Sequence, residues 1–194
     1  MAAIFEQFKN LLPFEEIQWE DYQGYFKKIE VPAKTTLIRE GEISKNVFFI
    51  EKGCIRVWFN NDGKDITFQF FFEQERVSSV ESFKKNIPSI VALETLEPCI
   101  LWVIGKKEMD RIMKNGMAMA EVRERWMDAL FERNLHYMKH CLSFIKDTPQ
   151  QRYLNLIEKQ PQVVQRVPQH YIASYLGITK VHLSRIKSKL LKGT

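Results

Sequence analysis

Histidine and cysteine are scarce in this sequence of 194 residues. Its three cysteines, Cys54, Cys99 and Cys141, are widely separated and odd in number, which argues against a disulfide framework or a four-thiolate cluster. The histidines all follow residue 130, so residues 29–104 contain none. Metal catalysis in that segment is excluded, because metal sites in small β-barrels need histidine and carboxylate ligands. We expect no bound metal and no cofactor.

Long apolar runs and common enzyme motifs are also absent. No run approaches the length of a membrane span, and the first six residues lack a basic-then-apolar signal peptide. We therefore expect a cytoplasmic protein with no membrane partner. The sequence contains no nucleophile elbow, P-loop or dinucleotide fingerprint, which indicates that the protein is not an enzyme.

The positive charge is concentrated toward the C-terminus. Of the formal net charge of +5, residues 147–194 supply +6, with eight lysine and arginine side chains against two carboxylates, so the first 146 residues sum to −1. A basic segment joined to a near-neutral body is typical of a nucleic-acid-binding module. Such a segment attracts phosphate backbones without selecting a sequence.

Residues 167–186 predict two short helices joined by a tight turn. Pro168 opens the first helix, where its missing N–H is no loss. Gly177 supplies the left-handed backbone of the turn, and Thr179 is placed to cap the next helix. Inward apolar residues recur at helical spacing in both helices. They are Ile172, Ala173, Leu176, Leu183, Ile186 and Leu190. This arrangement is typical of a helix-turn-helix.

The opposite face of the second helix has side chains suited to DNA. It carries Lys180, Val181, Ser184, Arg185 and Ser188. Arginine pairs bidentately with guanine in the major groove, lysine reaches guanine or phosphate, and valine meets a thymine methyl. The alternative is an ordinary antiparallel helix pair with a solvated basic face.

The body of the chain combines helical and strand patterns. Residues 4–28 have apolar side chains at helical spacing, whereas residues 29–104 contain short β-type runs separated by turn residues, including the hairpin signal Asn60–Gly63. Short strands at this spacing favour a β-barrel or β-roll. Val163 and Val164 predict one further short strand.

A single long helix is predicted over residues 118–146, followed by a break at Thr148 and another helix over 150–159. At 1.5 Å per residue the long helix extends about 40 Å and outruns a small barrel. Part of its apolar stripe therefore needs another partner, for which we expect a second copy of the chain. The alternative is a helix covered wholly by its own β domain. The residues expected at the dimer interface are Val122, Trp126, Leu130 and Tyr137.

The order of these parts resembles the CRP/FNR family of bacterial transcription regulators over nearly the whole chain. Leu37–Glu42 and Val47–Val57 are similar to its two glycine-bearing β-roll segments, and Ile172–Thr179 with Leu183–Ile186 are similar to its recognition unit. The resemblance implies an α+β fold of three parts. These are a cyclic-nucleotide-binding-like β-roll (double-stranded β-helix) over 1–117, a dimerisation helix over 118–146, and a helix-turn-helix DNA-binding domain over 147–194.

The resemblance implies a homodimer that places two recognition helices in successive major grooves of double-stranded DNA. By position, Lys180, Val181 and Arg185 would face base edges. Thr179, His182 and Ser184 would lie nearer phosphates. Family members commonly have glutamate where Val181 stands, so the target sequence is open. RNA polymerase is a candidate further partner of such a regulator.

The resemblance also locates an effector pocket, in which this sequence departs from the family. Members that bind cyclic nucleotides have a Gly-Glu pair and an Arg-Ser/Thr pair, where this chain has Ser78–Ser79 and Ser89–Ile90. The arginine that would neutralise the cyclic phosphate is missing, and a buried phosphate without a cation is poorly stabilised. We therefore expect weak or no cyclic-nucleotide binding, with the pocket either empty or altered for an unknown small-molecule effector.

One competing function is left open. Only Leu190–Thr194 follow the recognition helix, so we expect no full β-hairpin wing after it. The missing wing and Val181 favour a sensor or interaction protein that has lost DNA binding. The charge of residues 147–194, with Lys180 and Arg185 on the exposed face, favours DNA.

Overall fold

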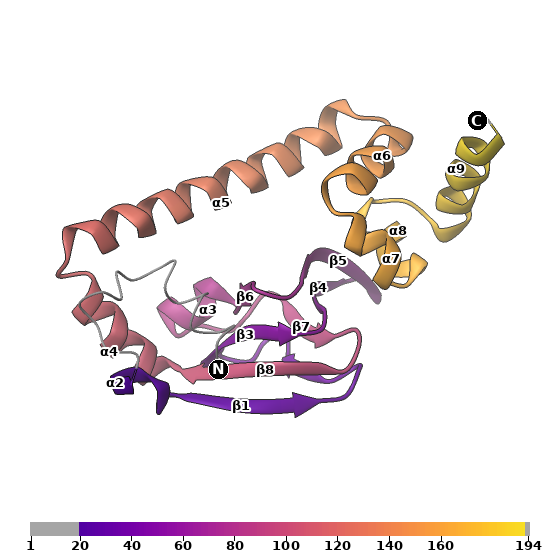
Figure 1. Ribbon diagram of the computed structural model, residues 1–194. Coiled ribbons are helices and arrows are strands. Elements are labelled where there is room, and N and C mark those ends of the chain that lie inside the picture. The colour runs from indigo at the N-terminus through magenta and orange to yellow at the C-terminus, as the bar shows by residue number, and fades with distance from the viewer. Residues whose placement is uncertain (1–19, 193–194) are drawn as a thin grey trace. The chain divides into compact units, whose positions relative to one another are not determined.

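The computed structural model describes residues 20–192, which divide into two compact units. The first unit contains residues up to Val57 together with Phe70–Glu132, and the second contains Trp58–Gln69 together with the residues from Arg133 onward. The helices in Figure 1 are α2 (Glu20–Gln23), α3 (Val80–Lys85), α4 (Lys106–Gly116), α5 (Ala120–Lys146), α6 (Pro149–Lys159), α7 (Pro161–Arg166), α8 (Gln169–Tyr175) and α9 (Lys180–Lys192).

The strands pair into two four-stranded sheets (Figure 1). One sheet has the order β1 (Phe26–Val31), β8 (Cys99–Gly105), β3 (Asn46–Lys52) and β6 (Arg76–Val77). The other has the order β2 (Thr36–Ile38), β7 (Ala92–Thr95), β4 (Ile55–Asn61) and β5 (Lys64–Phe71). The β-roll expected from the short, turn-bounded runs is therefore present.

Strand β3 is buried on both of its faces. Because successive side chains of a strand point to opposite faces, Phe48 and Ile50 belong to one core and Phe49 to another. The first core contains side chains from both sheets and fills the interior of the roll. The second includes Met109 of α4 and Val122 of α5, so these helices cover the outer face of β1, β8 and β3.

Two local predictions were wrong. Residues 26–28 were expected to continue a helix, but they begin β1, in which Phe26 pairs with Ile104 of β8. Val163 and Val164 were expected in a strand, but they lie in α7, where Val163 is fully buried. In both places, tertiary packing decided between two structures that the short apolar pattern allowed. Within the rest of that predicted helix, Glu20–Gln23 form α2, and residues 4–19 lie outside the described residues.

The hairpin signal between β4 and β5 forms the expected tight turn. Asp62 and Gly63 both have positive φ, 51° and 79°. This is the backbone that a two-residue hairpin needs to match the twist of its strands. The N–H of Gly63 also donates to Asn60 Oδ1 at 3.0 Å.

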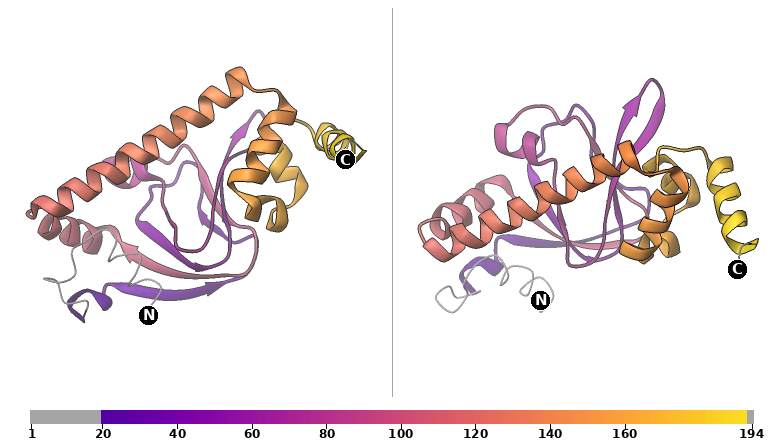
Figure 2. Two further views of the ribbon diagram at one scale, coloured as in Figure 1. Left: turned by 45° about the horizontal axis from the view of Figure 1, so that its top comes forward. Right: turned by 90° about the horizontal axis from the view of Figure 1, so that it is seen from above.

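The long helix α5 is one continuous element in the views of Figure 2. Its expected interface residues lie differently from the prediction. Val122 is only 1% exposed inside the first unit's core, and Trp126 packs against that core. Of the four expected residues, Leu130 is the exposed one. Tyr137 is part-buried and stacks on Phe68 of β5, with ring centroids 5.7 Å apart.

Another stripe of α5 carries the helix's most exposed apolar side chains. They include Met127, Phe131, Met138 and Ile145. The first part of α5 faces its own core through Val122, which turns these residues outward. The face available to a partner is therefore displaced around the helix from the expected one.

Candidate nucleic-acid interface

The turn between α8 and α9 is closed as its residues predict. Gly177 has a φ of +67°, and the N–H of Ile178 donates to the carbonyl of Ala173 at 3.0 Å. Thr179 Oγ1 accepts from the N–H of His182 at 3.2 Å, which satisfies a free donor of the first turn of α9. The predicted turn and N-cap are confirmed, and they set the direction in which α9 leaves α8.

The inward residues of the helix pair are buried. Ile172, Ala173 and Leu176 are at most 3% exposed, and Leu183 is 0% exposed. Because burial fixes the rotation of α9, its other side faces outward. The predicted DNA-contact residues on α9 are all exposed. They are Lys180, Val181, His182, Ser184, Arg185 and Ser188, and Thr179 before them is exposed as well.

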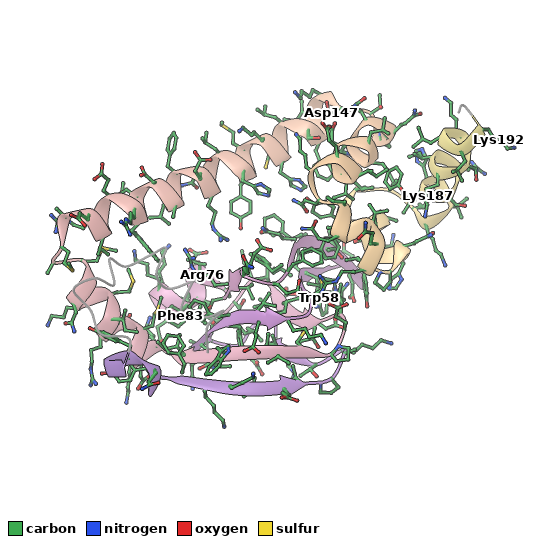
Figure 3. The ribbon with its side chains drawn as sticks, in the orientation of Figure 1. Trp58, Arg76, Phe83, Asp147, Lys187 and Lys192 are labelled. Carbon is green, nitrogen blue, oxygen red and sulfur yellow. The ribbon has the colours of Figure 1, made fainter. Side chains whose placement is uncertain are left out.

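Part of this outward surface is an open basic hollow. It is lined by Ser184, Arg185, Ser188, Lys189 and Lys192. No aspartate or glutamate follows Glu158 in the sequence, so the hollow has no carboxylate on its own helix or on α8. Figure 3 shows Lys192 at the end of α9, on the opposite side of the helix from Lys187. Lys189 and Lys192 contributed to the predicted basic charge but were not predicted to contact DNA. Their positions, four and seven residues after Arg185, place them on the same side of a helix and could have indicated this.

An arginine on α6 ties the turn of the helix-turn-helix to the end of α5. Arg152 donates from Nε and Nη2 to the carbonyl of Leu176, at 3.2 and 3.0 Å, and from Nη1 to that of Asp147 at 3.0 Å. Its guanidinium also lies over the ring of Phe144, 4.7 Å from the centroid. One cation thus orders the carbonyl just before Gly177.

A histidine of α5 packs against α8. The ring of His140 stacks on Tyr175 at 5.0 Å, and its Nδ1 lies 3.3 Å from the tyrosine hydroxyl. Burial lowers the pKa of His140, and the charges of His136 and Arg152 lower it further. Burial raises the pKa of Tyr175 to about 12. The junction therefore consists of two neutral rings near neutral pH.

The hairpin segment of the second unit also holds α8. Ser174 Oγ accepts from the N–H of Thr67 at 2.9 Å and donates to the carbonyl of Asp65 at 3.1 Å. Strand β5 lies at the edge of its sheet, and the Thr67 N–H and the Asp65 carbonyl are backbone groups of this strand. The Ser174 hydroxyl therefore provides an acceptor for one of them and a donor for the other. Tyr137 OH is 2.9 Å from Gln69 Oε1 of the same hairpin. Together these contacts join the part of α5 from Arg133 onward, α8 and the hairpin in the second unit.

In the first unit, two of the four residues expected in the effector pocket, Ser79 and Ser89, come together, whereas Ser78 bonds to strand β3. Ser79 and Ser89 are buried, with their hydroxyls 2.8 Å apart, and Ser89 Oγ is 2.6 Å from the carbonyl of Val91. Ser78 Oγ donates to the carbonyl of Asn46 at 2.8 Å. Ile90, in contrast, is 70% exposed.

Two lysines at helix α3, which follows Ser79, are engaged elsewhere. Lys85 pairs with Glu81 at 2.7 Å, and Lys106 Nζ donates to the carbonyls of Phe83 and Lys84. The serine hydroxyls are thus bonded to the protein itself, and no cation of the described residues bonds to them.

Over residues 20–192, no group of three or more histidine, cysteine, aspartate or glutamate side chains is placed to hold a metal ion. None of the described helices is long and apolar enough to cross a membrane.

The β-roll is similar to a known domain family. Residues 28–115 match the cyclic nucleotide-binding domain family. No curated protein matches the chain. Among solved structures, the c-di-GMP responsive global regulator CLP of Xanthomonas campestris is 17% identical, with a TM-score of 0.70 over 90% of this chain and 91% of that one.

Two further structures are similar over most of the chain. FixK2 from Bradyrhizobium japonicum is 16% identical, with a TM-score of 0.72 over 87% of this chain and 85% of that one. A CooA mutant from Carboxydothermus hydrogenoformans is 14% identical, with a TM-score of 0.67 over 93% and 83%. At such identities the likeness establishes the fold. Residues 28–115 thus match the cyclic nucleotide-binding domain family, and the chain shares the fold of these three structures over most of its length.

Proposed function

We propose that this protein is a homodimeric, sequence-specific DNA-binding transcription regulator of the CRP/FNR type that does not respond to cyclic AMP. The observation that carries the proposal is the outward face of α9, which is basic, exposed and free of carboxylates. Exposed cations on the second helix of a helix-turn-helix suit a major groove flanked by phosphates.

The outward face supports a division of contacts on DNA. Arg185 is exposed in the middle of α9 and would form a bidentate pair with guanine. Lys180 in the first turn would reach guanine or phosphate, and Val181, 62% exposed, would contact a thymine methyl. Residues nearer the edge of this face would bond phosphates. These are Thr179, His182 and Ser184.

The exposed stripe of α5 supports a second copy of the chain as the dimer partner. Its members recur at alternating steps of four and three, the spacing of a coiled-coil seam. They are Met127, Phe131, Asn134, Met138, Cys141 and Ile145. In a parallel pair each residue meets its own counterpart, and a polar Asn134 at one level would fix the register. Such pairing would relate two recognition helices by a two-fold axis.

The serine network supports the absence of a cyclic AMP response. A cyclic phosphate placed beside Ser79 and Ser89 would displace hydroxyl contacts of 2.8 and 2.6 Å and meet no bonded cation in return. Burying an unpaired charge in this way is strongly unfavourable.

The first test is selection of bound sequences from a random duplex pool, with and without cyclic AMP. We expect a palindromic motif to be enriched equally in both conditions. Enrichment only with cyclic AMP would retain the regulator and overturn the proposal about the pocket. No enrichment in either condition would favour the alternative, a sensor or interaction protein that does not bind DNA.

Dimerisation through α5 is tested by mild oxidation. Cys141 is exposed, whereas Cys54 and Cys99 are buried, so cross-linking reports on α5. A parallel seam brings two copies of Cys141 together and yields a covalent dimer, which an antiparallel seam does not. The matched control is Cys141→Ser with Lys139→Cys, which moves the thiol off the stripe and should abolish the cross-link. Equal cross-linking by both proteins would place the interface elsewhere.

A further inference from the structure

The last two turns of α9 lie beyond the part of the helix that can read bases. The helix has thirteen residues and is about 20 Å long. In a helix-turn-helix the first residues of this helix contact base edges, while the major groove is only about 8.5 Å deep. The C-terminal half of α9 must therefore emerge at the level of the phosphate backbone.

The polar residues of this half share one surface with Arg185, the base-reading residue in the middle of the helix. Arg185, Ser188 and Lys192 recur at steps of three and four, so they share the face opposite the buried Leu183. Lys189 flanks Ser188, and all four residues line the same open hollow. From Arg185 to Lys192 the helix rises about 10 Å, which separates a base-edge contact from a backbone contact.

The two lysines of this surface form no ion pairs within the described C-terminal helices. Neither Lys189 nor Lys192 forms an ion pair in the described part of the chain, and no carboxylate follows Glu158 in the sequence. Cations in the last turn of a helix also stabilise its dipole, which is the competing explanation for both lysines. A role in stabilising the dipole requires only that both lysines lie near the end of the helix. Their place beside Ser188 and Arg185 in one hollow instead suits the binding of an external anion.

We propose that Ser188, Lys189 and Lys192 form a phosphate-binding strip that grips the DNA backbone next to the base contacts of Arg185. The inference rests on the proposed function and assigns the C-terminal half of α9 within it. The ligand class is the phosphodiester of duplex DNA. Lysine supplies a point charge and the serine hydroxyl a donor, which position the protein without reading sequence.

The test compares salt dependence of binding for the wild type and Lys189→Gln/Lys192→Gln, on a duplex selected by the wild type. Binding is measured by fluorescence anisotropy between about 50 and 200 mM salt. Each lost phosphate contact lowers the slope of log Kobs against log salt by about 0.9, so four contacts in a dimer lower it by about 3 to 4. We expect this loss with the sequence preference unchanged.

The matched control is Lys159→Gln/Lys187→Gln, which removes the same charge outside the hollow. We expect it to retain the wild-type slope. An equal decrease of the salt-dependence slope for the control would mean that the lysines attract DNA only through the overall positive charge of the protein. That result would overturn the proposed phosphate-binding strip. A wild-type slope for Lys189→Gln/Lys192→Gln, with specific binding retained and a lower Tm, would assign both lysines to the helix dipole and overturn the strip alone. A wild type that binds no DNA specifically would overturn the proposed function itself.

Discussion

At the scale of single residues, Arg185 has the most direct consequence for DNA recognition. It is exposed at the middle of the outward face of α9, on a helix without acidic residues. We expect Arg185→Ala to weaken specific binding by about 1–3 kcal/mol and to relax the preference at one base pair. Repeating the sequence selection with the variant measures both effects. Unchanged affinity and unchanged preference would contradict the assignment.

Gly177 is a second residue whose role follows from its local geometry. A side chain there would adopt an unfavourable positive φ and approach Phe144 Cε1 at 2.9 Å. We expect Gly177→Ala to lower the free energy of unfolding by about 1–3 kcal/mol in denaturant titrations. Gly63→Ala is the matched control, because Gly63 also has a positive φ but nothing within 4 Å. If both variants lose the same stability, the contact with Phe144 contributes nothing.

At the scale of elements, Ser174 joins α8 to the edge of β5. Ser174→Ala removes the acceptor of the Thr67 N–H and the donor to the Asp65 carbonyl. Losing one such bond costs about 0.5–1.5 kcal/mol, so we expect the Thr67 amide to exchange about two- to tenfold faster with solvent hydrogen. Ser188→Ala, on the outward face of α9, should leave this amide unchanged. Equal protection of Thr67 in all three proteins would mean that the bridge does not form in solution.

Secondary-structure features that depend on local residues were predicted correctly, whereas some that depend on distant contacts were not. The break at Thr148, the cap at Thr179 and the turn at Gly177 were predicted, because such features depend on residues close in the chain. The strand at Phe26 was missed, because its pairing partner Ile104 lies far away in the sequence. Likewise, the outward face of α5 depends on which side meets the core, and spacing alone does not determine it.

At the scale of the whole molecule, stability should fall with mild acidification. Burial lowers the pKa of both His136 and His140 in the folded protein. Below about pH 6.5 the unfolded chain therefore binds protons more readily, which lowers the free energy of unfolding until the folded pKa is also passed. We expect lower stability at about pH 5.5 than at pH 7.5 in denaturant titrations, and a smaller difference for His140→Gln. The same pH dependence in that variant would exclude His140 as its source.

The sequence by itself determined the chemistry of the C-terminal module. Composition and short-range spacing account for three of its features. These are the absence of carboxylates after Glu158, the basic outward face and the turn at Gly177. Only the tertiary structure decided which groups remain available for binding. Burial of Val122 turned another stripe of α5 outward, and hydroxyl contacts occupied Ser79 and Ser89. Such outcomes depend on contacts between distant segments, where packing and hydrogen bonding select among faces that the sequence pattern leaves equivalent.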